Sequence, residues 1–173
     1  MKLPVRELVL LPLLGALMFA GDLVMDLLPN IHPVGMLIVV TTLTFRKKAL
    51  WSVYVYVFLS GLIQGFSTWW LPHLYLWAIL WGMVMLLPKK WLDTRAAPIL
   101  CGAVAGLFGL LFGTLWAPAQ AILMHLSFSA TLAWIAAGLG FDAIHGASNF
   151  ILTASLAIPL TRVLTKLNAK RGA

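Results

Sequence analysis

Long apolar runs alternate with short polar gaps along the whole chain. The runs fall near residues 6–28, 33–45, 49–66, 72–88, 97–118 and 139–167. Because a hydrocarbon core of about 30 Å needs about 20 helical residues, this pattern predicts six transmembrane helices. The second run is short, which indicates a helix packed inside a small bundle rather than one that faces lipid.

The gap between the fifth and sixth runs differs from the others. Residues 118–138 form a long apolar stretch without Lys or Arg. A long structureless loop is uncommon in a compact domain, so we expect this stretch to be partly helical and to fold over the outer face as a lid. The predicted fold class is therefore an all-α membrane protein, a compact six-helix bundle that forms one domain over residues 1–173.

The basic residues indicate which end of this bundle faces the cytoplasm. All twelve Lys and Arg residues fall into four clusters, within residues 2–6, 46–48, 89–95 and 162–171. Every second gap between the apolar runs holds none. Since cytoplasmic loops carry the basic excess, both termini are predicted to be cytoplasmic. The outer side then consists of residues 29–33, 65–73 and 117–141.

Composition supports the membrane class and excludes others. The chain is 62% hydrophobic and 10% charged, with a mean hydropathy of +0.98, which leaves too few polar residues to cover a water-soluble globule. The net charge of +7 sits at the ends of the apolar runs, so we expect contact with anionic lipid and not with nucleic acid. No metalloprotease, nucleophile-elbow or phosphate-loop motif is present, so we expect neither enzymatic activity nor a cofactor.

Three polar residues share one face of the sixth run. Asp142, His145 and Asn149 recur at i, i+3 and i+7 near its outer end. Polar side chains within a membrane segment are functional candidates by default, so we interpret these three as a ligand-contacting stripe. The alternative is a packing network in which Asp142 and His145 satisfy one another.

The predicted outer loops add further polar and aromatic candidates for a ligand site. They are Asn30, His32, Trp69, Trp70, His73 and Tyr75. Trp and Tyr are common interfacial anchors, but their density here favours rings that stack on an organic ligand. Asp22 and Asp26, at i and i+4 near the outer end of the first run, are expected to face solvent.

Small residues recur on two of the predicted helices. On the first run, Ala16 and Ala20 have the spacing that lets another helix approach closely. A second stripe of small residues lies on the fifth run and indicates packing within the bundle: Gly102, Gly106, Gly109 and Gly113.

These features together resemble the substrate-binding S components of energy-coupling factor (ECF) vitamin transporters. The resemblance covers nearly the whole chain, and it is carried by residues 28–32, 65–77, 106–113 and 141–150. It implies an outer pocket that captures a vitamin or vitamin precursor with high affinity, in a prokaryotic plasma membrane. It also implies that the first helix docks through Ala16 and Ala20 on a transmembrane T subunit, which two ATPase subunits drive.

The charge of the outer side narrows the ligand class. It holds Asp22, Asp26 and Asp142 but no Lys or Arg, and burying an anionic ligand without a cationic partner is costly. The acidic outer side therefore favours a neutral or cationic ring compound. Helix N-termini can also bind anions, which leaves anionic ligands open. A thiamine-type pyrimidine, a pyridoxine-like vitamin and cobalamin all fit.

Two other classes of protein remain open at the level of sequence. One is a stand-alone small transporter or a structural membrane subunit. The other is an intramembrane metalloenzyme with Asp142, His145 and either His32 or His125 as ligands. The histidines are scattered and form no tight ligand motif, which weighs against the metal site.

Overall fold

The computed structural model describes residues 4–28 and 30–169, and it contains no strand in that part of the chain. The prediction of an all-helical fold is confirmed. The longer helices are α1 (Val5–Val24), α2 (Val34–Phe45), α3 (Ala49–Gln64), α4 (His73–Met85), α6 (Ala97–Leu110), α7 (Phe112–Leu123) and α8 (Phe128–Ala169). Two short elements, η1 (Arg46–Lys48) and α5 (Lys89–Leu92), lie between them.

Within the described residues, three helical segments are long and apolar enough to cross a membrane, namely Val5–Val24, Ala97–Leu123 and Phe128–Ala169. The helices α2, α3 and α4 have only 12, 16 and 13 residues, fewer than the roughly 20 that a full span needs. The short α2 lies at the centre of the molecule, in contact with α1, α3, α4, α6 and α8. The prediction that this helix is packed among its neighbours is confirmed.

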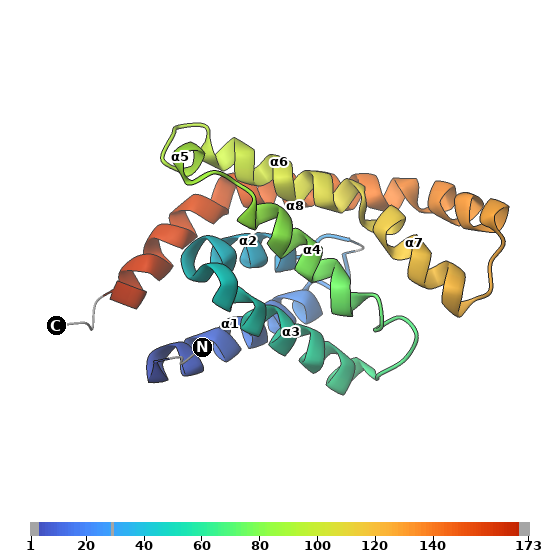
Figure 1. Cartoon of the computed structure of the whole chain (residues 1–173), viewed down its shortest axis with the longest axis horizontal. Helices are drawn as coiled ribbons and strands as arrows, with labels where there is room; N and C mark the ends of the chain where they lie inside the picture. The colour runs from blue at the N-terminus through green and yellow to red at the C-terminus, as the bar shows by residue number, and fades with distance from the viewer. Residues whose placement is uncertain (1–3, 29, 170–173) are drawn as a thin grey trace.

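The stretch between the fifth and sixth runs is helical, as expected, but it does not form the expected lid (Figure 1). The fifth run is split into α6 and α7, and α7 continues to Leu123, while α8 begins at Phe128, eleven residues before the predicted start. Only residues 124–127 connect the two helices. In Figure 1 the α7–α8 hairpin extends beyond the other helices instead of folding over them, and residues 118–138 contribute nothing to the described hydrophobic core.

Glycines allow α6 and α8 to pack at very short range. A Cβ atom on Gly109 would lie 2.7–2.8 Å from the backbone of Gly146, and one on Gly102 would lie 2.9 Å from the Ala154 side chain. Such distances are far below van der Waals contact, so larger residues would force the helices apart. The predicted packing role of the glycine stripe is therefore confirmed, and it fixes the position of the polar face of α8.

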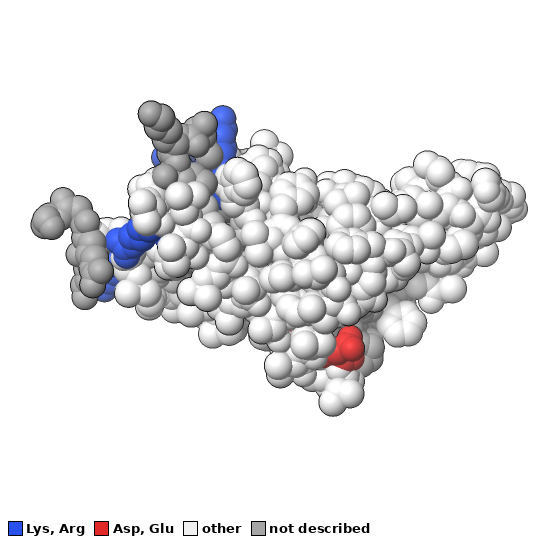
Figure 2. Space-filling model, turned by 90° about the horizontal axis from the view of Figure 1, so that it is seen from below, with Lys and Arg blue, Asp and Glu red and all other residues white. Residues whose placement is uncertain are grey.

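The described basic residues gather where both termini lie. Figure 1 places the two termini, α5 and the start of α6 at the same end of the molecule, and Figure 2 shows Lys and Arg there. We call it the basic end. At the opposite end of α1, Asp22 lies in the last turn of the helix and Asp26 follows it. We call the region around residues 22–32 the acidic end.

Two arginines at the basic end bind the final carbonyls of helices. Arg6 Nη1 donates a hydrogen bond to the Asn168 carbonyl at 2.6 Å, and Arg46 Nη2 donates to the Met85 carbonyl at 3.2 Å. Helix C-termini leave carbonyls without intrahelical partners and carry a partial negative charge. These arginines therefore stabilise the ends of α8 and α4 and tie distant parts of the chain together.

An ion pair also ties α1 to the turn between α2 and α3. Lys48 Nζ lies 2.5 Å from Glu7 Oε2, and the Glu7 residue is 8% exposed. No other salt bridge is formed among residues 4–28 and 30–169. A carboxylate this buried needs a cationic partner, so the pair fixes the basic end of the fold.

Candidate ligand site

The polar face predicted on the sixth run is one continuous buried face of α8. Asp142, His145 and Asn149 are 6%, 1% and 0% exposed, and Thr153, one helical turn further on, is 0% exposed. The i, i+3, i+7 spacing therefore identified the correct face. It points into the molecule, against the helices that surround α2.

His145 lies in a cluster of rings that come from four parts of the chain. We call His32, His73, Trp77, Phe112 and His145 the histidine–aromatic cluster. The ring centroid of His145 is 4.7 Å from that of Phe112 and 5.0 Å from that of His32. His32 is 5.9 Å from Trp77, and His73 is 6.1 Å from Trp77. The cluster thus joins the α1–α2 connection, α4, α7 and α8.

Several polar atoms of this region are buried without hydrogen-bond partners. Within the described residues, neither ring nitrogen of His145 and neither amide atom of Asn149 has a partner. His32 Nδ1, Trp77 Nε1 and Thr153 Oγ1 are unpaired as well. Each unpaired buried group costs about 1–3 kcal/mol, and such groups in a protein call for a specific explanation, such as a ligand or bound water.

A pocket at the acidic end leads to the cluster. Its volume is about 290 Å³, and it is lined by Asp22, Met25, Asp26, Leu28, Asn30 and His32. The volume is near the lower end of the range for small-molecule sites, roughly 300 Å³. Because His32 belongs to both the pocket lining and the cluster, it connects the acidic mouth with the buried rings.

Hydrogen bonds from two other helices position the mouth of the pocket. The Tyr56 hydroxyl of α3 donates to Asp22 Oδ2 at 2.8 Å, and the Ser148 hydroxyl of α8 donates to the Asn30 carbonyl at 3.0 Å. Asn30 has a φ of 59°, a left-handed conformation that Asn tolerates better than most residues. The connection between α1 and α2 is therefore held in a defined shape against α3 and α8.

Burial also sets the protonation state of His32. Desolvation lowers the pKa of His32 from 6.5, and the negative charge of Asp22 opposes this shift. Desolvation is the larger cause because it penalises the charged imidazolium. A neutral imidazole has one donor and one acceptor nitrogen, so His32 can contact either kind of group on a ligand.

Other predicted site residues have contacts that tie helices together. The Tyr75 hydroxyl donates to the Leu115 carbonyl at 2.8 Å, and Trp70 Nε1 donates to the Val57 carbonyl at 2.7 Å. These bonds join α4 to α7 and the 65–72 loop to α3. Trp69 lies beside the cluster, 5.4 Å from His73 between ring centroids, and its carbonyl lies 3.1 Å from His73 Nδ1.

Asp142 also has a structural contact. Its Oδ1 atom accepts a hydrogen bond from the backbone N–H of Gly113 at 3.0 Å, in the first turn of α7. A carboxylate at this position satisfies a free N–H and favours the positive end of the helix dipole. Asp142 and His145 do not hydrogen-bond to each other, so the mutual pairing that the packing alternative required is absent.

Trp77 was expected among the outer aromatic residues, and it lies at the centre of the ring cluster together with Phe112. Three residues of the site were not among the sequence candidates: Phe112, Tyr56, which holds Asp22, and Thr153, which continues the polar face of α8. Helical spacing could have found Thr153, because it is four residues after Asn149. Phe112 and Tyr56 carry no such signal, since each depends on contact with a distant segment.

The remaining sequence candidates lie elsewhere. On α1, Ala16 is half-buried and Ala20 is exposed, while the neighbouring Gly15 packs against the backbone of Ser52. His125 is exposed in the connection between α7 and α8 and is not part of the histidine–aromatic cluster. In the described part of the chain, no group of three or more His, Cys, Asp or Glu residues is arranged to hold a metal ion.

Comparison with known proteins finds no matching family model, no similar curated protein and no similar solved structure.

Proposed function

We propose that this chain is the substrate-binding S component of an ECF-type vitamin transporter in a prokaryotic plasma membrane. In this proposal α1, α2, α3, α4, the α6–α7 segment and α8 form six membrane-embedded helices, with both termini in the cytoplasm. The gathering of the described basic residues at one end supports the orientation. Cysteines introduced at positions 47 and 90 should react only from the cytoplasmic side, and those at 31 and 71 only from outside.

The observation that carries the proposal is the set of unpaired polar atoms around His145 and Asn149. Both side chains are almost fully buried, at 1% and 0% exposed. The His145 ring lies 5.0 Å from the ring of His32, which lines the pocket at the acidic end. A ligand with its own donors and acceptors would satisfy them, while the surrounding aromatic rings would stack on its faces. This is the composition that a binding site for a small polar ring requires.

The charge at the mouth favours a neutral or cationic ring compound. Asp22 and Asp26 line the pocket, and no Lys or Arg does. An anionic ligand would be repelled by these carboxylates, whereas a cationic ring such as a thiamine-type compound would be attracted. Pyridoxine-like vitamins fit as neutral rings. Cobalamin would need a larger pocket than this one, whose volume is about 290 Å³.

Native mass spectrometry of the purified protein, followed by calorimetric titration with the ligand that it identifies, tests the proposal. His145→Ala and Asn149→Ala should each weaken binding about tenfold to a hundredfold, because each leaves a ligand group unpaired. Thr42→Val is the matched control, since Thr42 is also buried with an unpaired hydroxyl but lies on α2 near the basic end. Equal affinity in all three variants would contradict the assignment of this site.

The docking part of the proposal concerns α1, which would approach the T subunit through Ala16 and Ala20. Ala20 is exposed and Ala16 is half-buried, and the large side chains of Val9, Leu13 and Val24 are exposed on the same helix. Small residues at this spacing permit close helix approach. Ala16→Leu together with Ala20→Leu should abolish transport and copurification of the T subunit and the two ATPase subunits, with ligand affinity unchanged.

Copurification also separates this proposal from a stand-alone transporter or a structural subunit. An S component brings down the T and ATPase subunits, whereas a stand-alone transporter carries its substrate into vesicles that contain this chain alone. Uptake by vesicles reconstituted with the purified chain would contradict the proposal, even with the ligand site intact.

A further inference from the structure

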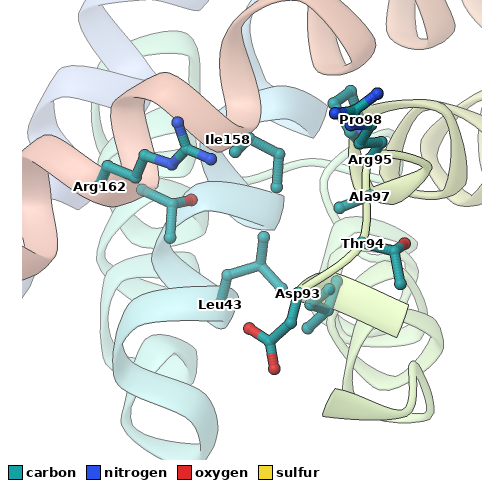
Figure 3. Close-up of a pocket in the computed structure, with 10 residues that line it drawn as sticks. Leu43, Asp93, Thr94, Arg95, Ala97, Pro98, Ile158 and Arg162 are labelled. Atoms are coloured by element: carbon teal, nitrogen blue, oxygen red, sulfur yellow. The ribbon is translucent and has the colours of Figure 1, made fainter. Parts of the chain in front are cut away.

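A second cavity lies at the basic end, away from the histidine–aromatic cluster. Its volume is about 450 Å³. Figure 3 shows its walls, which come from Leu43 near the end of α2, from residues 92–98 between α5 and α6, and from Ile158 and Arg162 of α8. These three segments are far apart in sequence and meet around this cavity. The proposed vitamin site uses none of them.

Two arginines in the lining have no protein partner. Unlike Arg6 and Arg46, which bind helix carbonyls, Arg95 and Arg162 make no hydrogen bond or ion pair within the described part of the chain. Both are exposed and line the cavity from opposite sides. A guanidinium group presents a rigid fork of donors that matches a phosphate.

One further feature of the lining favours an anion. The Oγ1 atom of Thr161, another lining residue, is buried without a hydrogen-bond partner, and a hydroxyl can donate to a phosphate oxygen. The first turn of the 14-residue α6 also borders the cavity through Ala97 and Pro98. Pro98 has no N–H and the Ala97 N–H bonds to the Thr94 carbonyl, so this helix end contributes only the positive end of its dipole.

The rest of the lining indicates which phosphate compounds fit. Leu43 and Ile158 provide an apolar wall, and Asp93 adds one carboxylate to the lining. An apolar wall beside a cationic rim suits a phospholipid, whose phosphate and hydrocarbon parts are adjacent. Asp93 would accept a hydrogen bond from the ammonium group of ethanolamine or from the hydroxyl groups of glycerol.

We propose that this cavity binds a phosphate group between Arg95 and Arg162, supplied by a membrane phospholipid headgroup or by a soluble phosphate compound. Basic pockets between membrane helices on the cytoplasmic side commonly bind lipid headgroups. The site is independent of the proposed vitamin site, so either can fail without the other. Bound phospholipid would hold α2, α6 and α8 together at the basic end.

The test compares two double variants of the full chain that lose the same charge. Lipid binding is measured by native mass spectrometry with three phospholipids of the same acyl composition: phosphatidylglycerol, phosphatidylethanolamine and phosphatidylcholine. Arg95→Gln with Arg162→Gln removes both cavity arginines. Lys90→Gln with Lys166→Gln removes the same charge from exposed positions of the basic end outside the lining. The first variant should lose bound phosphatidylglycerol about tenfold or more, and the second should retain it.

The outcomes are distinct. Equal losses in the two double variants would mean that lipid responds to the general charge of the basic end, and would overturn the site. Retained binding in the arginine variant would overturn it as well.

Arginine-dependent binding of inorganic phosphate to delipidated protein, with no preference among lipids, would support the phosphate site and assign it to a soluble ligand. Asp93→Asn should reduce phosphatidylethanolamine more than phosphatidylglycerol if a headgroup is bound.

Discussion

The basic end pairs its buried charged groups, whereas the histidine–aromatic cluster leaves buried ring and amide groups unpaired. At the basic end the buried carboxylate of Glu7 is paired with Lys48, and Arg6 and Arg46 bind helix carbonyls. Below the acidic end, His145 and Asn149 are more deeply buried and have no partner in the described part of the chain. Both regions belong to the same helices, so the difference does not come from a difference in fold.

The contrast indicates which groups serve stability and which serve binding. A paired buried charge fixes the geometry of the protein, whereas an unpaired buried group lowers stability by about 1–3 kcal/mol. Proteins commonly retain such costs where function needs them. Removing an unpaired polar group from the cluster should therefore raise the free energy of unfolding, and removing a paired charge from the basic end should lower it.

The largest effect is expected for the glycine contact that holds the polar face of α8 in place. Gly109→Ala would set a Cβ atom 2.7–2.8 Å from the Gly146 backbone, where nothing can move without separating α6 and α8. We expect a loss of about 3 kcal/mol in the free energy of unfolding. Chemical unfolding of the detergent-solubilised protein measures it.

Gly82→Ala is the control for this prediction. A Cβ atom on Gly82 of α4 would meet nothing within 4 Å, so the change should alter stability by about 1 kcal/mol at most, in the stabilising direction, because Ala favours helix. If the two variants are equally stable, the close α6–α8 contact does not position the cluster as we describe.

A smaller effect, with opposite signs in the two regions, is expected for polar side chains. His145→Phe removes two unpaired nitrogens and places a ring beside Phe112, so the ligand-free protein should gain about 1–2 kcal/mol while ligand binding is lost. Lys48→Met leaves Glu7 buried and unpaired, and it should lose about 1–2 kcal/mol. The thermal unfolding midpoints of the two variants should therefore move in opposite directions.

The exposed Lys47 provides the control at the basic end, and Lys47→Met should change stability by less than about 0.5 kcal/mol. A loss of stability in His145→Phe comparable with that in Lys48→Met would remove the distinction between the two regions. It would mean that His145 is a packing residue.

The sequence predicted the helices and the buried face of α8 because both depend on local periodicity. Apolar runs gave the helix positions, and the i, i+3, i+7 spacing of Asp142, His145 and Asn149 gave a face that is buried in the structure. Residues 118–138 were expected to be partly helical, and they are helical except for residues 124–127. Their placement was not predicted, because the lack of charge was interpreted as a sign of a lid instead of a helical hairpin.

The partners of the site residues were harder to predict because they come from long-range contacts. No spacing in the sequence shows that Asp142 accepts a bond from Gly113, 29 residues away, or that Tyr56 binds Asp22, 34 residues away. Tyr75 was interpreted as a ligand residue because aromatic residues are dense around it, yet its hydroxyl bonds to the Leu115 carbonyl. A high density of aromatic residues along the chain therefore overestimates the number of residues that can face a ligand.

The smallest expected effect separates two tyrosines that each make one hydrogen bond of 2.8 Å. Tyr56→Phe and Tyr75→Phe should each lower the free energy of unfolding by about 1 kcal/mol. Only Tyr56 holds a pocket residue, Asp22, so only Tyr56→Phe should change ligand affinity, by a factor of about three to ten for a cationic ring. Calorimetric titration of both variants measures it. Because the two substitutions remove the same chemical group, a change in affinity for Tyr75→Phe as large as that for Tyr56→Phe would place the Tyr75 hydroxyl in the ligand site and move the centre of the site away from the acidic end.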